Sequence, residues 1–194
     1  MITKVAIRTL KTPRLVLRPL AITDAGRRFE VFSDPQTCWT AGVDVASSLP
    51  EMARATNALI VMTHQRLAFH WAIDLVESGR CIGFCDIHAP APAFMAWKEH
   101  HLGYVLAREY WNRGLMSEAL AEVVGFALGD AGIYRLEALV ATYNAASKRV
   151  LEKAGFVCEG LSRERGWWSA GRHDMAIYSL SRSALADCSG QKIR

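Results

Sequence analysis

The chain has 194 residues, of which 51% are hydrophobic, and its formal net charge is +4. This length favours one domain with a sizeable core, and the apolar content argues against a disordered chain. No apolar run reaches the roughly 18 residues that span a membrane. Residues 1–10 lack the apolar stretch of a secretion signal, so we expect a cytoplasmic protein with no membrane partner. The basic residues are dispersed, which disfavours direct nucleic-acid binding and suits an anionic small ligand equally well.

Hydrophobic periodicity and turn residues divide the chain into strands and helices. The expected elements, in chain order, are a strand at 14–20, helices at 23–32 and 48–65, strands at 67–76, 81–87 and 101–107, a helix from 114 to 129, a strand at 135–142, a helix at 145–153, and strands at 156–163 and 175–180. Strands mixed with helices along one chain favour a mixed α/β sheet.

The most regular strand signal lies in the first arm of a predicted hairpin. Phe69, Trp71 and Ile73 recur at period two, which indicates a strand with one apolar face. Residues 78–80 form the turn into the next strand. Residues 89–92, which contain two prolines, are expected to form a loop beside a substrate cleft.

The cysteines do not suggest disulfides or a metal site. There are five of them at irregular spacing, which is a poor disulfide framework. Cys81 and Cys85 lie four apart in a predicted strand, so both are expected to point to one face. No second ligand pair stands at metal spacing. We therefore expect buried free thiols and no metal.

A strand-turn-helix segment carries the main binding motif. The strand at 101–107 leads through Trp111-Asn112-Arg113-Gly114 directly into a helix. A helix N-terminus leaves its first amides unpaired and carries partial positive charge, so a phosphate placed there gains hydrogen bonds. Gly114 allows close approach of the backbone, and Arg113 adds a cation. The segment matches neither Gly-x-x-x-x-Gly-Lys-Ser/Thr nor Gly-x-Gly-x-x-Gly, which disfavours a nucleoside triphosphate or a dinucleotide.

A second segment runs from Asn144 to Phe156, where a predicted strand gives way to a helix. Asn144 suits a helix cap, and its amide suits hydrogen bonding to a ligand; both roles remain open. Ser147 lies one helical turn further on and can face the same cleft, although serine is common in a first helical turn.

Further motifs accompany these two segments. In chain order the set is Thr12-Pro13-Arg14-Leu15-Val16-Leu17-Arg18-Pro19, Phe32-Ser33-Asp34-Pro35, Gly103-Tyr104, Tyr110-Trp111-Asn112-Arg113-Gly114, Ser117-Glu118-Ala119, Asn144, Ser147, Leu151-Glu152-Lys153-Ala154-Gly155-Phe156, Glu159-Gly160 and His173-Asp174. In this order and spacing the chain resembles the GNAT acetyltransferase superfamily. Within it, the chain looks most like the RimJ/RimL branch of ribosomal-protein N-terminal acetyltransferases. The resemblance covers nearly the whole chain.

The resemblance implies an α/β (α+β) fold, with one GNAT domain at 1–183 and a polar tail at 184–194. Its splayed mixed sheet would hold acetyl-CoA, with strand backbone against the pantetheine arm and turn amides against the pyrophosphate. The residues implied to bind this co-substrate are Val105, Leu106, Ala107, Arg113, Gly114, Leu115, Met116, Ser117, Asn144 and Ser147. Much of the superfamily has Gln or Arg at the position of Trp111. A tryptophan there is normal for the RimJ/RimL branch.

The implied chemistry is direct attack of a neutral amine on the thioester, with stabilisation of the oxyanion and departure of the CoA thiolate. By resemblance, Ser147 serves the leaving thiolate by proton transfer or by hydrogen bonding, and Asn144 positions the pantetheine. Direct transfer needs no covalent intermediate on a cysteine.

The general base is less sharply indicated. The branch can use a glutamate after the Glu-Gly pair of the penultimate strand, but the aligned position here is Gly166. Glu164, two residues earlier and expected on the same strand face, is the substitute. Glu99, His100 or His101, acting through a water, are the alternatives.

The favoured acceptor, from the branch resemblance, is a protein N-terminal α-amine. The alternatives are a small-molecule amine, such as a polyamine, amino acid or antibiotic, or a non-catalytic acyl-CoA-binding module. The assembly is left as a monomer or a homodimer. His173-Asp174 is predicted to be structural. Trp167-Trp168 is predicted to be a packed aromatic pair, with lining of the acceptor cleft as the alternative.

Overall fold

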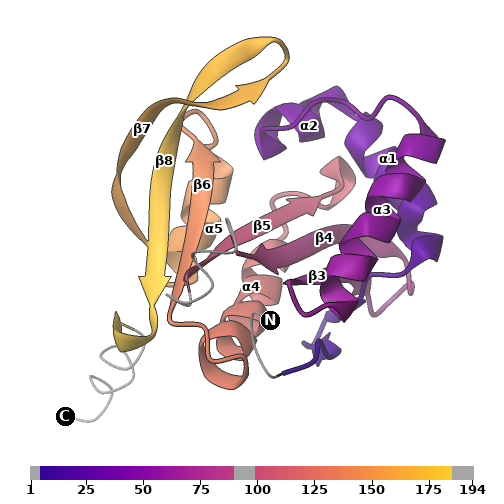
Figure 1. The fold of residues 1–194 in the computed structure, drawn as a ribbon, viewed down its shortest axis with the longest axis horizontal. Coiled ribbons are helices and arrows are strands. Elements are labelled where there is room, and N and C mark those ends of the chain that lie inside the picture. The colour runs from indigo at the N-terminus through magenta and orange to yellow at the C-terminus, as the bar shows by residue number, and fades with distance from the viewer. Residues whose placement is uncertain (1–4, 90–98, 185–194) are drawn as a thin grey trace.

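Eight strands form one mixed sheet in the computed structural model, which describes residues 5–89 and 99–184 (Figure 1). The strands are β1 (Leu10–Lys11), β2 (Leu15–Pro19), β3 (Ala68–Leu75), β4 (Cys81–His88), β5 (Glu99–Leu106), β6 (Arg135–Ala141), β7 (Val157–Trp168) and β8 (Gly171–Ser181). Their order across the sheet is β1-β2-β3-β4-β5-β6-β8-β7. Neighbouring strands are antiparallel except β5 and β6, which are parallel.

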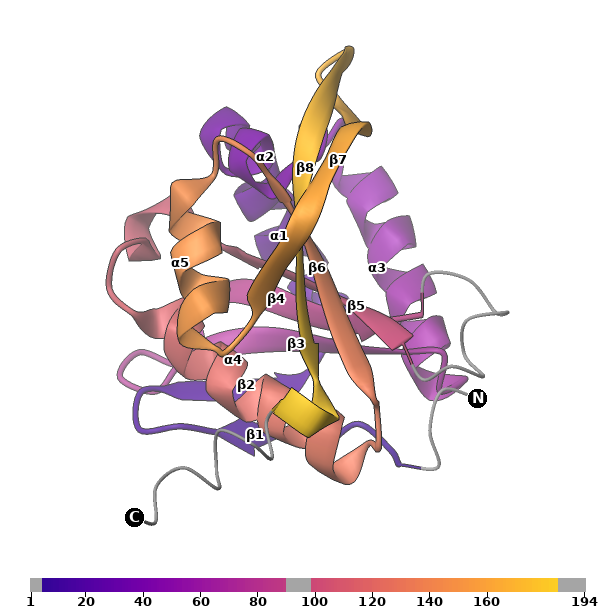
Figure 2. The same cartoon turned by 90° about the vertical axis from the view of Figure 1, so that its left-hand side faces the viewer.

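The helices cover both faces of this sheet, as Figure 2 shows. They are η1 (Ile22–Asp24), α1 (Ala25–Ser33), α2 (Pro35–Ala41), α3 (Leu49–His64), η3 (Arg108–Tyr110), α4 (Leu115–Gly125), the π-helical turn η4 (Phe126–Asp130) and α5 (Ala145–Lys153). Within the described ranges, no helix has the length and apolar character needed to cross a membrane.

The main hydrophobic core lies between the sheet and α4 with α5. It includes Phe69, Trp71 and Ile73 of β3, the residues predicted to share one apolar face. A smaller cluster on the other face joins Ala72 of β3 to Val31 of α1. Because helices cover both faces, β3 is almost entirely buried rather than having one solvated face. The expected α/β architecture with a mixed sheet is confirmed.

The sheet opens between β5 and β6. These parallel strands pair only from Glu99↔Arg135 to His101↔Glu137. Beyond that point β5 stays with β4 and β6 stays with β8, and the two strands diverge (Figure 1). The predicted splay therefore lies directly before the helix α4 that connects the two strands.

One helix was not expected from the sequence. The helix predicted at 23–32 corresponds to α1, which ends at Ser33. Asp34 then has an extended backbone, and its side chain accepts a hydrogen bond of 2.9 Å from the Thr37 amide. This cap, with proline in the first turn, starts α2 at once. The left-handed Gly42 ends α2.

The expectation that Cys81 and Cys85 share a face is wrong. A β-bulge opposite Ile73 and Asp74 places Ile82 as an extra residue in β4, and one extra residue reverses the alternation of side chains. Cys85 consequently lies in the main core, whereas Cys81 packs with the smaller cluster. Two thiols on opposite faces cannot act as a metal-ligand pair.

The cysteines of the described ranges are free thiols, but they are not all buried. Cys38 and Cys85 are buried as predicted. Cys158 is exposed because it lies on β7, the last strand at one edge of the sheet.

The last two strands are longer than predicted and form a hairpin that projects beyond the sheet (Figure 1). Ser169 and Ala170 make its turn with φ values of 50° and 55°, the left-handed backbone that a tight two-residue hairpin turn requires. Trp168 is 2% exposed and Trp167 is 60% exposed. The predicted packed pair is therefore wrong, because neighbouring residues on a strand point to opposite faces.

Two expectations fall largely outside the described residues. The loop at 89–92 is described only at Ala89, and the tail at 184–194 only at Ala184.

The contact between β4 and β5 next to the opening leads to a first prediction. A Cβ at Gly83 would lie 2.3 Å from the carbonyl oxygen of Val105 across this strand pair. We expect Gly83→Ala to lower the free energy of unfolding in urea by about 1–3 kcal/mol through overpacking. Gly26→Ala in α1 is the control, since its Cβ would meet nothing within 4 Å, and a helix favours Ala over Gly by up to about 1 kcal/mol. Equal destabilisation by both changes would contradict the cross-strand contact.

Candidate active site

A cleft of about 420 Å³ lies between the diverging strands β5 and β6. Its walls come from both strands, the turn before α4, the start of α5 and the end of α2. The lining residues are Thr40, Ala41, Gly42, Leu102, Gly103, Tyr104, Val105, Leu106, Tyr110, Trp111, Asn112, Arg113, Gly114, Leu115, Met116, Ser117, Ala138, Leu139, Val140, Ala141, Asn144, Ala146, Ser147, Arg149, Val150, Lys153 and Met175.

The glycine turn opens α4 at one end of this cleft. Gly114 is the N-cap residue, with φ +72° and ψ 3°, a left-handed backbone that glycine adopts without a steric penalty. No side chain caps the helix at this position, so its first amides remain available to an anion. Leu115 and Met116 are buried in the main core, and they fix the start of the helix beside the cleft.

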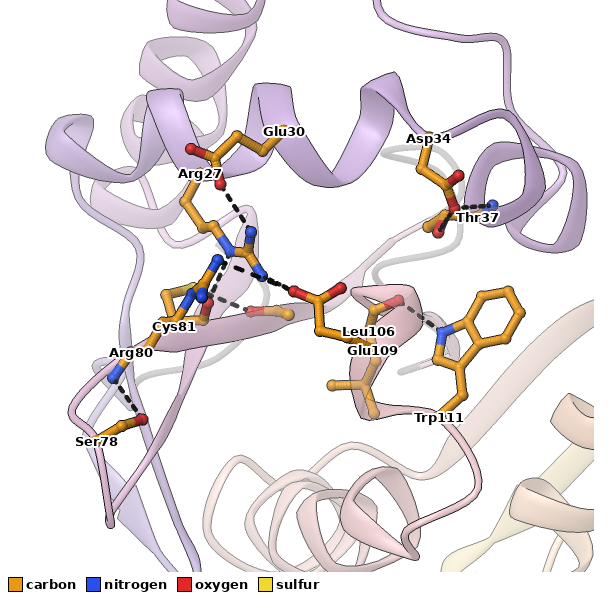
Figure 3. A network of polar contacts seen from close by, with 11 residues as sticks. Arg27, Glu30, Asp34, Thr37, Ser78, Arg80, Cys81, Leu106, Glu109 and Trp111 are labelled. Carbon is orange, nitrogen blue, oxygen red and sulfur yellow. Dashed lines mark hydrogen bonds and ion pairs between the residues drawn. The ribbon is translucent and has the colours of Figure 1, made fainter.

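The backbone before the glycine turn is held by side chains from both sides (Figure 3). The indole of Trp111 donates a hydrogen bond of 2.8 Å to the carbonyl oxygen of Leu106 at the end of β5. Glu109 of η3 accepts a bond of 2.9 Å from Arg27 of α1, which also donates to the Cys81 carbonyl. Trp111 therefore acts as a brace between strand and turn.

The N-terminal strand region also braces this turn. Arg14 donates to the carboxylate of Glu118 in the first turn of α4, at 2.6 Å from Nε, and to the carbonyl of Arg113 at 3.1 Å. Burial would raise the pKa of Glu118, but hydrogen bonds from Thr12 and Arg14 lower it. Glu118 therefore stays ionised and paired beside the predicted phosphate site. The guanidinium of Arg113 lies over the Tyr110 ring, 5.6 Å from its centroid.

Asn144 caps α5 and also ties it to α2. Its Oδ1 accepts a hydrogen bond of 3.0 Å from the Ser147 amide, and its Nδ2 donates to the Thr40 carbonyl at 2.8 Å. The predicted capping role is confirmed. Because both polar atoms of the amide are engaged, Asn144 joins the two helix ends that border the cleft.

Ser147 meets an unexpected partner. Its hydroxyl shares a hydrogen bond of 2.7 Å with the hydroxyl of Tyr104 on β5, which also donates to the Ser147 carbonyl at 3.2 Å. Burial raises the pKa of Tyr104 well above its usual value, against a smaller lowering by Ser147, so the phenol stays protonated. In the sequence, Tyr104 stands out only as part of the family motif Gly103-Tyr104. It lies 43 residues from Ser147, so no local pattern predicts their contact.

Most of the predicted co-substrate residues line the cleft together. They are Val105, Leu106, Arg113, Gly114, Leu115, Met116, Ser117, Asn144 and Ser147. Ala107 does not line the cleft. Its amide donates to the Ile82 carbonyl and its carbonyl accepts from the Tyr110 amide, both at 2.9 Å. The strand therefore contributes Val105 and Leu106 to the cleft, and Ala107 begins the turn.

Glu164 lies outside the cleft. It is exposed on the hairpin, and its amide donates a bond of 2.8 Å to Asp174 Oδ1. Its φ is +51°, and the pairing of β7 with β8 is irregular between Ser162 and Gly166. The alternation of faces that linked Glu164 to Gly166 is thereby interrupted.

The three alternative bases lie on β5, where it pairs with β6. Glu99 is ion-paired with Arg135 at 3.2 Å. His100 is fully buried. His101 Nε2 lies 3.4 Å from the Glu137 carboxylate, one residue before Leu102, which lines the cleft.

His173 and Asp174 are structural, as predicted. The His173 ring stacks on Trp168, with ring centroids 4.0 Å apart, and meets the Trp39 ring edge-on at 5.2 Å. Asp174 holds the backbone of the neighbouring strand through its bond with the Glu164 amide. These contacts attach the hairpin to α2 at one side of the cleft.

The comparisons with known proteins agree with this geometry. The chain matches the family model described as "Acetyltransferase (GNAT) domain" over residues 14–157. It therefore belongs to the GNAT acetyltransferase family. It is an acetyl-CoA-dependent N-acyltransferase, as the family and its named N-acetyltransferase relatives establish.

Individual relatives are distant in sequence and close in fold. The "Uncharacterized N-acetyltransferase YoaA" of Bacillus subtilis (strain 168) is 28% identical over 171 residues, which cover 88% of this chain and 95% of the relative. A solved structure of RimL, a ribosomal L7/L12 alpha-N-protein acetyltransferase in complex with coenzyme A, has a TM-score of 0.80 at 19% identity, covering 91% of this chain and 99% of that one. A spermidine N-acetyltransferase from Vibrio cholerae, with CoA and spermine, has a TM-score of 0.78 at 15% identity, covering 90% and 99%.

The double role of Asn144 gives a second prediction. We expect Asn144→Ala to lower the free energy of unfolding by about 1–2 kcal/mol, because the cap and the link to α2 are both lost. Asn144→Ser retains an oxygen that can cap the helix and removes the donor to Thr40, so its loss should be smaller. Urea denaturation of the two variants measures the difference. Identical losses would show that the cap contributes nothing.

Proposed function

We propose that this chain transfers the acetyl group of acetyl-CoA to a protein N-terminal α-amine, as an enzyme of the RimJ/RimL type. The observation that carries the acetyl-CoA part of the proposal is the joining of an uncapped helix N-terminus to a strand opening in one continuous cleft. Such a cleft suits a ligand with an anionic pyrophosphate at one end and a narrow uncharged arm at the other. The likeness to ribosomal-protein N-acetyltransferases supports the choice of acceptor.

The residues of the cleft fit acetyl-CoA in charge and in shape. The first-turn amides of α4 suit the pyrophosphate, with Arg113 beside them. The edges of β5 and β6 no longer bond to each other beyond His101, so backbone groups of β5 that face this opening, such as the Leu106 amide, can bond the pantetheine amides. Arg149 and Lys153 of α5 also line the cleft and supply further positive charge.

In the proposed reaction, the neutral acceptor amine attacks the thioester carbonyl and the carbon–sulfur bond then breaks. The departing thiolate takes a hydrogen bond from Ser147, whose hydroxyl is oriented by Tyr104, or takes its proton, in which case the proton lost by the attacking nitrogen restores the hydroxyl. Holding both reactants in one cleft supplies much of the acceleration. Asn144 positions the start of α5, and hence Ser147, by its two hydrogen bonds.

A small-molecule amine is the second candidate acceptor, and the fold shared with a spermidine N-acetyltransferase supports including it. The test is release of the CoA thiol by the purified chain with acetyl-CoA and a panel of amines. Peptides with free alanine or serine N-termini, the same peptides blocked at the N-terminus, and spermidine make up the panel. Turnover of free peptides only would support the proposal, and turnover of spermidine only would favour the second candidate.

The glycine turn gives a third prediction. Gly114→Val should weaken acetyl-CoA binding at least about 10-fold, because a β-branched residue is strained at φ +72° and covers the amides. Isothermal titration measures the affinity. Gly160→Val is the matched control, since its Cβ would meet nothing within 4 Å and it lies on β7 away from the cleft. An affinity for acetyl-CoA unaffected by Gly114→Val would refute the assigned phosphate site.

The position of Ser147 gives a fourth prediction. Ser147→Ala should lower kcat by about 10-fold or more while the Kd for acetyl-CoA stays within about twofold, because the hydroxyl serves the leaving group rather than binding. Stopped assays and titration with acetyl-CoA separate the two quantities. Ser78→Ala in an exposed turn is the control. A parallel loss of affinity and turnover would assign Ser147 to binding instead.

A further inference from the structure

A row of titratable side chains crosses three strands on the face of the sheet that α1 and α3 cover. It consists of Asp86 and His88 on β4, His101 on β5 and Glu137 on β6. His88 lies directly opposite His101, and His101 lies directly opposite Glu137, in the strand register. The residues that alternate with them, such as Ile87 and Leu102, belong to the main core on the other face.

The row is made of two histidine–carboxylate pairs. His88 Nδ1 lies 2.8 Å from Asp86 Oδ2, and His101 Nε2 lies 3.4 Å from Glu137 Oε1. The two imidazole rings meet edge to face, with their centroids 5.7 Å apart. A carboxylate on one ring nitrogen leaves the other nitrogen as the atom that takes or gives a proton.

Residues next to both carboxylates line the cleft, although the four side chains of the row do not themselves line it. His101↔Glu137 is the last register pair before β5 and β6 separate, and Leu102 and Ala138, the next residues, line the cleft. A Cβ at Gly103 would lie 2.7 Å from Asp86 Oδ1, so the Asp86 carboxylate rests on the bare backbone of a residue that also lines the cleft.

The row lies on the face of the sheet opposite the main core. The glycine turn and α5 hold the charged part of the cleft on the face of the main core. The cleft is also bordered by Thr40 at the end of α2 and by Gly42, the residue that follows this helix. An amine that meets the acetyl group from the face of the row reaches the sheet where the strands begin to separate.

The geometry points to His101, oriented by Glu137, as the general base that takes the proton of the acceptor ammonium, with the Asp86–His88 pair passing that proton to solvent. This inference rests on the proposed function and extends it. The N–H bond of the ammonium breaks, its electron pair stays on nitrogen, and the proton joins the free ring nitrogen of His101. A water carries it to His88, which releases it, so both histidines return to their neutral forms. Asp86 and Glu137 are positioning residues.

The local charges suit this division of roles. Burial lowers the pKa of His101, and Glu137 only partly opposes this, so the ring is neutral and able to accept a proton near pH 7. The hydrogen bond with Asp86 raises the pKa of His88, whose side chain is 39% exposed and can exchange protons with water.

Other charged groups around the row are consistent with these roles. Glu99 and Arg165 act on His101 with opposite signs. Arg28 of α1 and His70 of β3 lie on the Asp86 side. Burial lowers the pKa of His70 to about 4, so it adds no positive charge at neutral pH.

The test is the pH dependence of kcat/KM with acetyl-CoA and an alanine-starting peptide. His101→Gln should lower kcat/KM about 100-fold at pH 7. The deficit should shrink above about pH 9, where an α-amine with a pKa near 8 is already neutral. His88→Gln and Glu137→Gln should cause smaller losses with the same trend, and the Kd for acetyl-CoA should stay unchanged. His64→Gln at the exposed end of α3 is the control.

A second measurement does not depend on turnover. Ring titrations by NMR should show a lower pKa for His88 in Asp86→Asn, since the carboxylate no longer stabilises the imidazolium. They should show a higher pKa for His101 in His88→Gln, since a like charge is removed. A purely structural polar row would not change the pH profile of kcat/KM.

The outcomes separate the two proposals. No turnover of the peptide by the unmodified chain refutes the acceptor proposed above. Turnover with a His101→Gln profile parallel to that of the unmodified chain refutes the base while leaving the acceptor intact. Independent titration of the two histidines overturns the relay between them.

Discussion

The parting of β5 and β6 after His101 and Glu137 is the constraint on which the rest of the site depends. Along the separated edges, backbone groups that would bond a neighbouring strand need other partners, because an unsatisfied buried amide costs about 1–3 kcal/mol. The Trp111 indole is such a hydrogen-bond partner for the Leu106 carbonyl. A ligand with its own amides can bond the remaining backbone groups. The outer edges remain paired with β4 and β8, so the opening stays local while the sheet stays continuous.

The site is assembled by contacts between segments far apart in sequence. Arg14 reaches the first turn of α4, Arg27 reaches η3, and Asn144 reaches the end of α2. Tyr104 and Ser147 join the two sides of the opening. Each contact fixes a helix end or a turn rather than a helix centre. Binding groups positioned by such supporting bonds are held closely enough for a reaction that depends on orientation.

The two faces of the sheet carry different chemistry. The main-core face presents an uncapped helix start and basic residues of α5 to the cleft, which favours an anion. The opposite face presents two histidine–carboxylate pairs at the point of separation. Acetyl-CoA needs a site for its phosphates, and an acceptor ammonium needs a group that takes its proton. The first face suits the phosphates, and the opposite face suits the proton transfer that we propose. This arrangement places the Asp86 and Glu137 carboxylates on the face away from the predicted phosphate site, where like charges would repel, while Glu118, which does lie beside that site, is paired with Arg14.

The sequence by itself determined the elements with strong local signals. Period-two apolar residues marked β3, Asn144 marked the start of α5, and Gly114 marked the turn into α4. Only the tertiary structure decided the rest. The helix α2, the bulge at Ile82, the Tyr104–Ser147 bond and the pairing of His88 with His101 depend on which segments become neighbours. Local propensity reports how a segment prefers to fold. Cross-strand register, set by burial over the whole sheet, decides which side chains meet.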